Sequence, residues 1–464
     1  MQFIWKRIRE TIPIFLAVVL FLSVTRSLSG SDFRQETEQQ RQARMQWWRE
    51  ARFGMFIHWG LYSLPARHEW VKMRERMTNE EYQKYFDLFN PDLYDPVEWA
   101  KAAKMAGMKY VVITTKHHEG FCLWDSKYTD YKATNTPYGK DLITPFVKAF
   151  RDQGIRIGFY HSLIDWHHPE FPIDRNHPMR DNEEMRKTNK SRDIKKYAQY
   201  LHNQVRELMT NYGQIDYFFP DFSYPGEDGK GRDDWQSESL LEMVRELQPQ
   251  IIINDRLDLL DHRWGWDFRT PEQFMPREWV TMDGERVPWE TCQTFSGSWG
   301  YYRDEKTWKS GRQLIVMLIE TVSKGGNLLL NVGPTARGTF DDRSMERLRA
   351  IGDWMKTHNR SIYGCTAAPE AFKAPKNTIL TYNPDTNRMY VHVLEWPMGK
   401  LDLDGFGGKV KYAQLLNDAS EIRFSGSRGA WMSGEESPDT ETLTLNLPIN
   451  KPDVEVPVIE LFLK

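Results

Sequence analysis

Cysteine is scarce in this sequence, with 3 residues among 464. Cys122, Cys292 and Cys365 are too few and too widely spaced for a disulfide framework or for the clustered ligands of a structural zinc site. Because their number is odd, at least one thiol stays unpaired even if the protein is exported to an oxidising compartment. We therefore expect these side chains to be buried as small apolar groups.

An excess of charge of one sign is also missing. The chain has 62 Lys and Arg against 65 Asp and Glu, which gives a formal net charge of −3. Nucleic-acid-binding proteins carry a surplus of basic residues that contacts the phosphates. We therefore expect no nucleic-acid partner for this chain.

Only one hydrophobic run is prominent, and it lies near the N-terminus. Ile14–Val24 is apolar, follows Lys6, Arg7 and Arg9, and precedes several small residues. The run is shorter than the roughly 20 residues of a membrane-spanning helix. This order of charged, apolar and small residues is typical of a secretory signal. We predict a signal peptide over residues 1–30, with export to the periplasm or extracellular space and no other membrane contact; an uncleaved anchor is the alternative.

The first apolar strand lacks the glycine-rich turn of a dinucleotide-binding fold. Instead, short apolar runs alternate with helical stretches between about residues 45 and 365, which indicates parallel strands joined by crossover helices. We predict a (β/α)8-like, TIM-type catalytic barrel over residues 31–365, with an open doubly wound sheet as the alternative. The expected strands are Phe53–Trp59, Tyr110–Thr115, Ile155–His161, Ile215–Pro220, Ile251–Asn254, Asn327–Val332 and, as a further candidate, Trp289–Thr294. The expected helices are Pro96–Ala106, Thr144–Gln153, Asp193–Tyr212, Gln236–Leu247, Gln313–Ser323 and Ser344–His358.

The pattern changes after residue 365. Short alternating runs, separated by turns rich in Gly, Asp, Asn and Pro, are typical of an antiparallel β-sandwich. We predict such a sandwich as a C-terminal domain over residues 366–464. Its expected strands are Thr378–Asn383, Arg388–Glu395, Lys409–Leu415, Thr442–Leu447 and Val456–Leu463.

Polar side chains follow nearly every predicted strand of the barrel. The carboxyl ends of barrel strands meet at one mouth, where barrel enzymes hold their catalytic groups. Packing alone does not explain such a convergence from five strands. The residues are His58, His117, His118, Tyr160, His161, Asp221, Asn254, Asp255 and Arg256.

Asp221 is the first candidate for a catalytic role. Strand alternation places Tyr217, Phe219 and Asp221 on one face. If that face is the barrel interior, Asp221 stands at the mouth above aromatic rings. A carboxylate in that position can attack an anomeric carbon and form a glycosyl-enzyme ester. A helix-capping or turn aspartate is the alternative.

A retaining glycosidase needs a second carboxyl group roughly 5 Å from the first. Glu272 is the first choice, because it lies on a long connection that can carry it over the mouth. Glu290 is the second choice. For either residue, the alternative is a solvated carboxylate or the partner of a nearby arginine.

The histidines raise the question of a metal. Seven of the twelve lie between His58 and His168, but strand neighbours such as His117 and His118 point to opposite faces. A His-Glu-x-x-His motif is also missing. We therefore predict no metal and no cofactor, with neutral imidazoles as partners of sugar hydroxyls. A metal-dependent hydrolase remains an alternative.

Two further features suit sugar binding. Glu69 and Trp70 place a carboxylate beside an indole, which can accept from hydroxyls and stack on a sugar face. A capping glutamate beside a core tryptophan fits the same residues. Arg256 can hold a carboxylate in place or donate to ring substituents.

Four segments, in this order, resemble the α-L-fucosidases of glycoside hydrolase family 29, and the resemblance runs from about residue 45 to residue 365. The region after it resembles the C-terminal sandwich of that family. The segments are Phe53-Gly-Met-Phe-Ile-His58-Trp-Gly, Lys116-His117-His118-Glu-Gly-Phe-Cys-Leu-Trp124-Asp-Ser, Gly158-Phe-Tyr160-His-Ser and Ser323-Lys-Gly-Gly-Asn-Leu-Leu-Leu-Asn-Val-Gly-Pro334.

The resemblance implies a retaining exo-glycosidase that removes terminal α-L-fucose from oligosaccharides or glycoconjugates through a covalent glycosyl-enzyme. It leaves the oligomeric state open. Asp221 matches the family's nucleophile. Glu272 resembles the usual place of the acid/base residue, and Glu290 lies near a site proposed in some members. The residues that match those binding the fucose ring are His58, Glu69, Trp70, His117, His118, Tyr160 and Arg256, and Trp299 and Tyr301 resemble a nearby aromatic contribution.

Phe219 departs from the family pattern. Members often carry Trp at this position, two residues before the nucleophile. Phenylalanine keeps a ring under the sugar but lacks the indole N–H donor. The choice between fucose and L-galactose therefore stays open. An α-L-galactosidase or other L-sugar glycosidase of the same fold, or a carbohydrate-binding pseudoenzyme, is the alternative.

Overall fold

The computed structural model describes residues 30–426 and 441–464. The predicted signal peptide therefore lies outside the described residues, apart from its last position. Within the described ranges, no helix has both the length and the hydropathy that a bilayer span requires.

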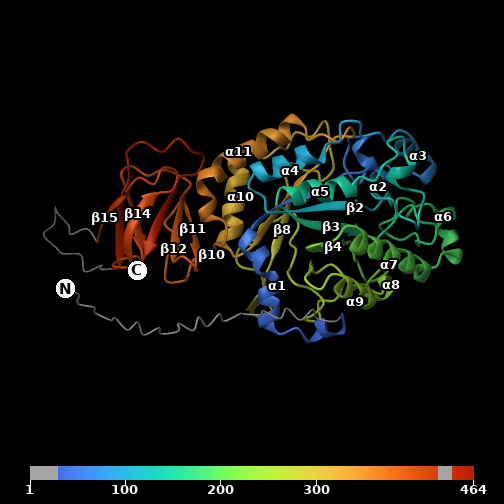
Figure 1. Ribbon diagram of the computed structural model, residues 1–464, viewed down its shortest axis with the longest axis horizontal. Helices are drawn as coiled ribbons and strands as arrows, with labels where there is room; N and C mark the ends of the chain where they lie inside the picture. The colour runs from blue at the N-terminus through green and yellow to red at the C-terminus, as the bar shows by residue number, and fades with distance from the viewer. Residues whose placement is uncertain (1–29, 427–440) are drawn as a thin grey trace, which may run out of the picture.

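A seven-stranded parallel sheet forms the larger part of the molecule (Figure 1). Its strand order is β5-β4-β3-β2-β1-β9-β8, and every neighbouring pair is parallel. The predicted strands are confirmed to within two residues at their ends. The observed bounds are β1 (Phe53–Ile57), β2 (Tyr110–Lys116), β3 (Arg156–Ser162), β4 (Tyr217–Asp221), β5 (Ile252–Ile253), β8 (Glu290–Thr294) and β9 (Asn327–Val332).

Residues 267–273 close the sheet between its edge strands, β5 and β8. The Asp267 N–H donates to the Ile253 carbonyl at 2.9 Å, and the Gln273 N–H donates to the Cys292 carbonyl at 3.0 Å. The segment contains one proline, which lacks a ladder donor, so it forms isolated parallel bridges rather than a regular strand. It nevertheless occupies the eighth strand position, and the predicted (β/α)8-like barrel is confirmed.

Helices cover the outside of this sheet (Figure 1). A helix that packs one face on a sheet buries an apolar stripe and leaves polar residues outside. The six predicted helices are all present. The helical bounds of the barrel are α2 (Val71–Arg74), α3 (Asn79–Asp87), α4 (Pro96–Met105), α5 (Ile143–Asp152), α6 (Glu183–Lys187), α7 (Ile194–Asn211), α8 (Arg232–Trp235), α9 (Ser237–Leu247), α10 (Gly311–Ser323) and α11 (Asp342–His358).

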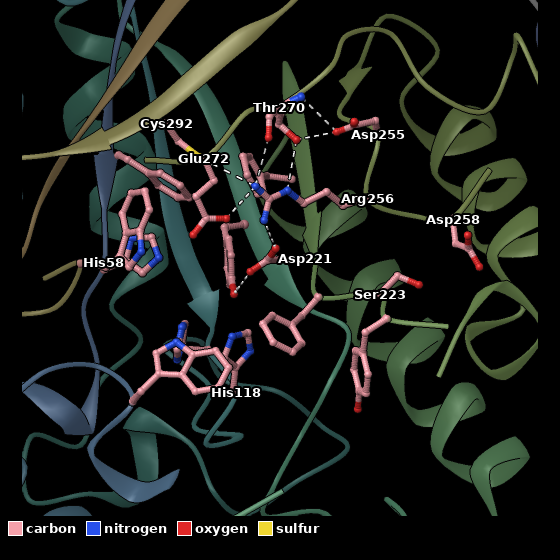
Figure 2. Close-up of a pocket in the computed structure, with 18 of the residues that line it drawn as sticks. His58, His118, Asp221, Ser223, Asp255, Arg256, Asp258, Thr270, Glu272 and Cys292 are labelled. Atoms are coloured by element: carbon pink, nitrogen blue, oxygen red, sulfur yellow. Dashed lines mark hydrogen bonds and ion pairs between the residues drawn. The ribbon is translucent and has the colours of Figure 1, made fainter. Parts of the chain in front are cut away.

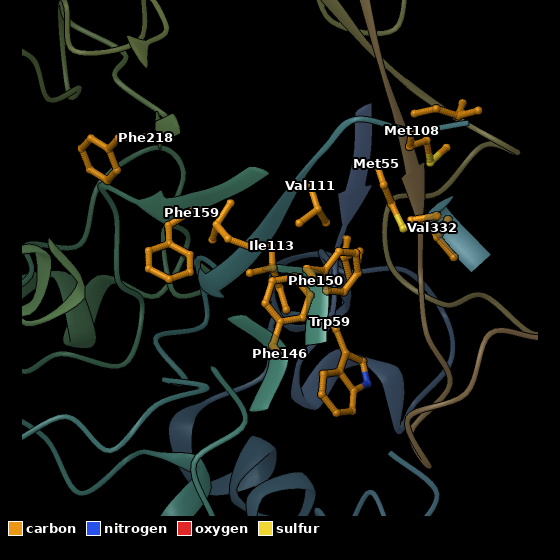
Figure 3. Close-up of a cluster of buried hydrophobic side chains, with 14 of the residues drawn as sticks. Met55, Trp59, Met108, Val111, Ile113, Phe146, Phe150, Phe159, Phe218 and Val332 are labelled. Atoms are coloured by element: carbon orange, nitrogen blue, oxygen red, sulfur yellow. The ribbon is translucent and has the colours of Figure 1, made fainter. Parts of the chain in front are cut away.

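Strand alternation divides the core into two layers. On β2, Val111 and Ile113 point outward and pack with Phe146 and Phe150 of α5 (Figure 3). Tyr110, the first residue of β2, points into the barrel with other aromatic residues. The outer layer therefore fixes the helices, and the inner layer fills the barrel below its mouth.

Helix α1 (Glu38–Ala51), which the sequence analysis did not predict, covers the amino end of the barrel. Its buried face carries Arg41 and Arg44 as well as Trp48, so an apolar stripe does not reveal it. Trp48 donates to Glu290 at the start of β8. The helix thus closes the end of the barrel that lies opposite the barrel mouth.

The C-terminal region is an antiparallel sandwich, as predicted. A five-stranded sheet, β10-β11-β12-β17-β14, packs on a three-stranded sheet, β13-β16-β15, around an apolar core. It lies beside α10 and α11 (Figure 1), where the Trp354 indole donates to the Val456 carbonyl at 2.8 Å. The prediction missed β10, β13 and β15. The bounds are β10 (Thr366–Ala367), β11 (Thr378–Asn383), β12 (Arg388–Val393), β13 (Lys400–Asp404), β14 (Val410–Leu415), β15 (Arg423–Gly426), β16 (Thr442–Asn446) and β17 (Val458–Leu463), with a separate hairpin of β6 (Thr281–Met282) and β7 (Glu285–Arg286) in the barrel.

A buried ion cluster fixes the closing segment to α1 and α9. The Asp267 carboxylate accepts from Arg44 at 2.7 and 2.9 Å, from Arg245 at 2.7 Å and from the Ile253 N–H at 2.8 Å. Burial alone would raise the pKa of Asp267, but the guanidinium groups of Arg245 and Arg44 outweigh burial and hold the pKa well below its ordinary value. The closing segment therefore depends on a carboxylate that stays charged in the core.

Replacing Asp267 tests this anchor. In Asp267→Asn, Arg245 stays buried without its counter-charge and Arg44 keeps only Glu36. We therefore expect the free energy of unfolding to fall by about 3–5 kcal/mol. Urea-induced unfolding measures the loss. The matched control is Asp261→Asn, whose carboxylate pairs with Arg232 at the surface and should change stability little. Equal stability of Asp267→Asn and the wild type would contradict the anchoring role.

Candidate active site

A cavity of about 470 Å³ opens at the carboxyl ends of the parallel strands (Figure 2). Ten of the predicted site residues line it: His58, Trp70, His117, His118, Tyr160, Phe219, Asp221, Arg256, Glu272 and Trp299. Asp255, which the strand-end pattern placed at the mouth without a role, lines it too. The lining residues that the sequence analysis did not assign to the site are Phe56, Phe222, Ser223, Tyr224, Pro225, Asp258, Leu260, Thr270 and Cys292. Glu69 and Glu290 are not among the lining residues.

Asp221 ends β4, and its carboxylate faces this cavity. One oxygen accepts from the Tyr160 hydroxyl at 2.7 Å, and the other accepts from Arg256 Nη1 at 2.6 Å. These partners lie on β3 and after β5, the two neighbours of β4 in the sheet. The side chain therefore serves no helix cap, and the alternation that placed it on the interior face is correct.

Arg256 joins Asp221 to Glu272. Its Nη1 is 2.6 Å from Asp221 and its Nη2 is 2.8 Å from Glu272 (Figure 2). Both carboxylates therefore bind terminal nitrogens of one guanidinium, and they form a pair of the kind that glycosidases use. Glu272 is 41% exposed at the mouth, whereas Asp221 is 11% exposed.

Thr270 and Asp255 fix the orientation of Arg256. Its Nε donates to the Thr270 hydroxyl at 3.1 Å, and Thr270 in turn donates to Asp255. Burial alone would lower the pKa of Arg256, but the carboxylates of Asp221 and Glu272 raise it well above its ordinary value. The guanidinium therefore stays charged between the two acids.

Aromatic rings form the floor of the cavity. Tyr160 and Phe219 stack with ring centroids 5.7 Å apart, and Trp299 stacks on His58 at 5.1 Å. The Arg256 guanidinium lies 5.2 Å from the Phe219 ring centre. Phe219 thus contributes a ring to the floor, as the alternation predicted.

Three neutral histidines stand at the side of the cavity. Burial lowers the pKa of His58 and His118 well below the ordinary value, and it lowers the pKa of His117 to about 3. Residues 30–426 and 441–464 contain no grouping of three or more His, Cys, Asp or Glu side chains suited to a metal ion. All three imidazoles line the cavity, where a neutral ring can exchange hydrogen bonds with a ligand.

Glu69 lies behind the floor. Its Oε2 accepts from the backbone N–H groups of Trp299 at 3.1 Å and Gly300 at 2.9 Å, and from the Ser298 hydroxyl at 3.3 Å. Burial raises the pKa of Glu69 to about 7. The carboxyl group therefore holds the turn that carries Trp299, and direct sugar binding by Glu69 stays a prediction.

Glu290 lies at the opposite end of the barrel. It begins β8 and accepts from Trp48 at 3.1 Å, from Tyr217 at 2.7 Å and from Tyr110. The arginine that joins Asp221 to Glu272 does not contact it. The geometry therefore favours Glu272 over Glu290 as the second carboxyl group of the site.

The residues that the sequence analysis did not assign had weak signals. Thr270 lies on the closing segment, and its hydrogen bond to Asp255 depends on how that segment folds back. Tyr224 follows the strand end at Asp221 and resembles an ordinary turn residue. The three cysteines are free and buried, as expected, and Cys292 forms part of the cavity wall.

Comparison with known proteins places this geometry in a family. The family model for alpha-L-fucosidases matches residues 20–360. The chain belongs to the alpha-L-fucosidase family, and it is a glycoside hydrolase. An alpha-L-fucosidase of Dictyostelium discoideum is 28% identical over 450 residues, 90% of this chain and 91% of that protein. The tissue alpha-L-fucosidase of Homo sapiens is 30% identical over 388 residues, 77% of each chain.

Solved alpha-L-fucosidase structures share the fold. Isoenzyme 1 from Paenibacillus thiaminolyticus superposes with a TM-score of 0.85 at 46% identity, over 91% of this chain and 99% of its own. A GH29 alpha-L-fucosidase from Bacteroides thetaiotaomicron gives a TM-score of 0.78 at 30% identity, over 91% and 96% of the two chains. That structure holds a trapped covalent intermediate in complex with 2-fluoro-fucosyl fluoride.

The buried position of Glu290 gives a pH-dependent stability. Burial raises its pKa from 4.5 to about 7, against the opposing effect of its three donors. The folded protein therefore binds this proton more tightly than the unfolded chain does. The resulting stabilisation is complete below about pH 4.5 and is lost as the pH rises through 7.

The variant Glu290→Gln isolates this effect, because glutamine keeps the shape without titrating. We expect the free energy of unfolding of the wild type, relative to the variant, to fall by roughly 3 kcal/mol between pH 4.5 and pH 7 and then to level off. Urea-induced unfolding across this range measures it. Parallel stability curves for the two proteins would contradict the raised pKa.

Proposed function

We propose that this alpha-L-fucosidase family member hydrolyses terminal α-L-fucosyl linkages of oligosaccharides or glycoconjugates with retention of configuration. The observation that carries the proposal is the pairing of Asp221 and Glu272 on one guanidinium at the mouth of the barrel. The covalent intermediate trapped in the Bacteroides thetaiotaomicron relative supports a double displacement.

In the proposed reaction, Asp221 attacks the anomeric carbon and forms an ester as the bond to the leaving oxygen breaks. Glu272, at the exposed side of the cavity, gives its proton to that oxygen. It then takes a proton from the water that cleaves the ester, which frees the sugar and restores Asp221. The hydrogen bond from Tyr160 and the ion pair with Arg256 hold the attacking carboxylate in place.

The remaining cavity residues are proposed to bind the sugar. The rings of Phe219, Trp299 and Trp70 suit the apolar face of a 6-deoxy sugar. The imidazoles of His117 and His118 suit its hydroxyl groups. The pocket is concave at one end of the barrel, which favours a terminal sugar over an internal one.

Hydrolysis of 4-nitrophenyl α-L-fucoside tests the function. We expect the wild type to release nitrophenol, and we expect Asp221→Ala to lose about three orders of magnitude or more in kcat, because the variant lacks the carboxylate that forms the ester. Circular dichroism checks that the variant is folded. Sugar binding by the wild type without nitrophenol release would instead indicate a binding-only protein, and release of 4-nitrophenol from the α-L-galactoside alone would indicate a different L-sugar.

The acid/base role is tested with azide. Nitrophenolate leaves without protonation, so the ester should accumulate in Glu272→Ala, and azide should accelerate its breakdown by an order of magnitude or more. The comparison variant is Glu290→Gln, which should keep its activity and show no response to azide. Azide rescue of Glu290→Gln, with none for Glu272→Ala, would transfer the acid/base role to Glu290.

We also propose that the chain is exported, with a catalytic domain over residues 31–365 and a sandwich domain over residues 366–464. The order of charged, apolar and small residues at the N-terminus supports export. N-terminal sequencing of the protein recovered outside the cytoplasm should give a chain that begins near residue 30. Recovery of the intact N-terminus there would indicate an uncleaved anchor.

A further inference from the structure

Two histidines of the cavity, His58 and His118, have their Nδ1 atoms held by side chains from the sheet. His58 follows β1 and contacts Asn331 of β9, whereas His118 follows β2 and contacts Ser162 of β3. In a neutral imidazole, one nitrogen carries hydrogen and the other accepts. The partner at Nδ1 therefore decides what Nε2 offers to a ligand.

The proton of His58 is fixed by a chain of two hydrogen bonds. The Asn331 Nδ2 group donates to the Trp299 carbonyl at 2.6 Å, which orients the amide. Its Oδ1 then faces His58 Nδ1 at 2.7 Å. An amide oxygen only accepts hydrogen bonds. Nδ1 of His58 therefore carries the hydrogen.

The proton of His118 is fixed in the same way. The Ser162 hydroxyl donates its single hydrogen to the Ile164 carbonyl at 2.7 Å. The same oxygen lies 2.7 Å from His118 Nδ1, so it accepts there. Donation from Ser162 to His118 instead would leave two acceptor oxygens in contact. Nδ1 of His118 therefore carries the hydrogen as well.

Both rings are neutral, because burial holds their pKa values well below the ordinary value. A protonated imidazole would donate from both nitrogens, whereas these rings donate only from Nδ1. His117 differs, since Glu119 lies 3.3 Å from its Nδ1 without forming a hydrogen bond. A carboxyl group can donate or accept there, so the structure fixes no tautomer for His117.

We propose that Asn331 and Ser162 act as positioning residues that set the hydrogen-bond polarity of the cavity, by fixing His58 and His118 with Nδ1 protonated and Nε2 as an acceptor. The two rings then recognise sugar hydroxyls that donate. This inference rests on the proposed function and narrows its substrate class. The fucosyl group must carry free hydroxyls at two ring positions.

The consequence is selection against substituted sugars. A methyl ether, acyl ester or sulfate ester removes the hydroxyl hydrogen and brings an acceptor oxygen against an Nε2 lone pair. A site built around a hydrogen bond rejects an analogue that cannot form it, because a buried polar group is left without a partner. The cavity therefore excludes a sugar that carries such a group at either position.

Nitrogen-15 NMR of the histidine side chains tests the tautomers directly. The wild-type protein is labelled with [15N]histidine, and His58→Asn and His118→Asn variants assign the two rings. Two-bond proton–nitrogen correlations near neutral pH should show a protonated Nδ1 and an unprotonated Nε2 for both. A protonated Nε2 in either ring would overturn the proposal, whether or not the protein hydrolyses fucosides.

Substrate analogues test the role of Ser162. The ring hydroxyls at positions 3 and 4 of the 4-nitrophenyl fucoside are replaced, one at a time, by hydrogen or by fluorine, which accepts but cannot donate. In the wild type, the kcat/KM of the fluoro substrate should be as low as that of the deoxy substrate. In Ser162→Ala, His118 is free to protonate Nε2, so the fluoro-to-deoxy ratio of kcat/KM should rise about tenfold at one position.

Two controls separate this effect from a general loss of structure. Ser162→Thr keeps the hydroxyl and should keep the wild-type ratio. Ser237→Ala removes a buried hydroxyl at the start of α9, away from the cavity, and should also leave the ratio unchanged. An unchanged ratio in Ser162→Ala would overturn the positioning role of Ser162.

The two proposals fail in different ways. The proposed function is wrong if the wild type does not hydrolyse the unmodified fucoside. The tautomer assignment is wrong if the nitrogen-15 spectrum shows a protonated Nε2. It is also wrong if the wild type has the same kcat/KM for a fluoro analogue as for the unmodified substrate. Each result stands without the other.

Discussion

The site depends on one guanidinium that contacts two acids. Arg256 binds Asp221 and Glu272 at the same time, and it lies over the ring of Phe219. In the proposed reaction, Asp221 loses its charge on forming the ester while Glu272 gains one by giving up its proton. The arginine contacts both acids, so it can stabilise whichever of them is charged with little reorganisation of charge around it.

The rest of the fold holds this trio in place. Glu272 lies on residues 267–273, which complete the barrel without forming a regular strand. The buried Asp267 fixes that segment to Arg44 of α1 and Arg245 of α9. A helix at the amino end of the barrel thus positions a carboxyl group near the opposite end. Between Asp267 and Glu272, bridges to Trp289 and Cys292 hold the segment against the β8 edge of the sheet.

Sequence patterns predicted the regular parts of this structure. Apolar runs fixed the strands, and the polar residue after each run, such as Asp221, marked the mouth. Helix α1 was missed because its buried face carries arginines such as Arg44. The closing segment was missed as a strand because proline interrupts its ladder. The contacts of Asn331 and Ser162 depend on the register between strands, which no local pattern reveals.

The most direct test of this account is to trap the covalent intermediate. The wild-type protein is treated with 2-fluoro-fucosyl fluoride, digested, and mapped by mass spectrometry. The account predicts one fluorofucosyl group per chain, in ester linkage to Asp221. Attachment to a different residue, or turnover of fucosides with inversion and no adduct, would contradict it.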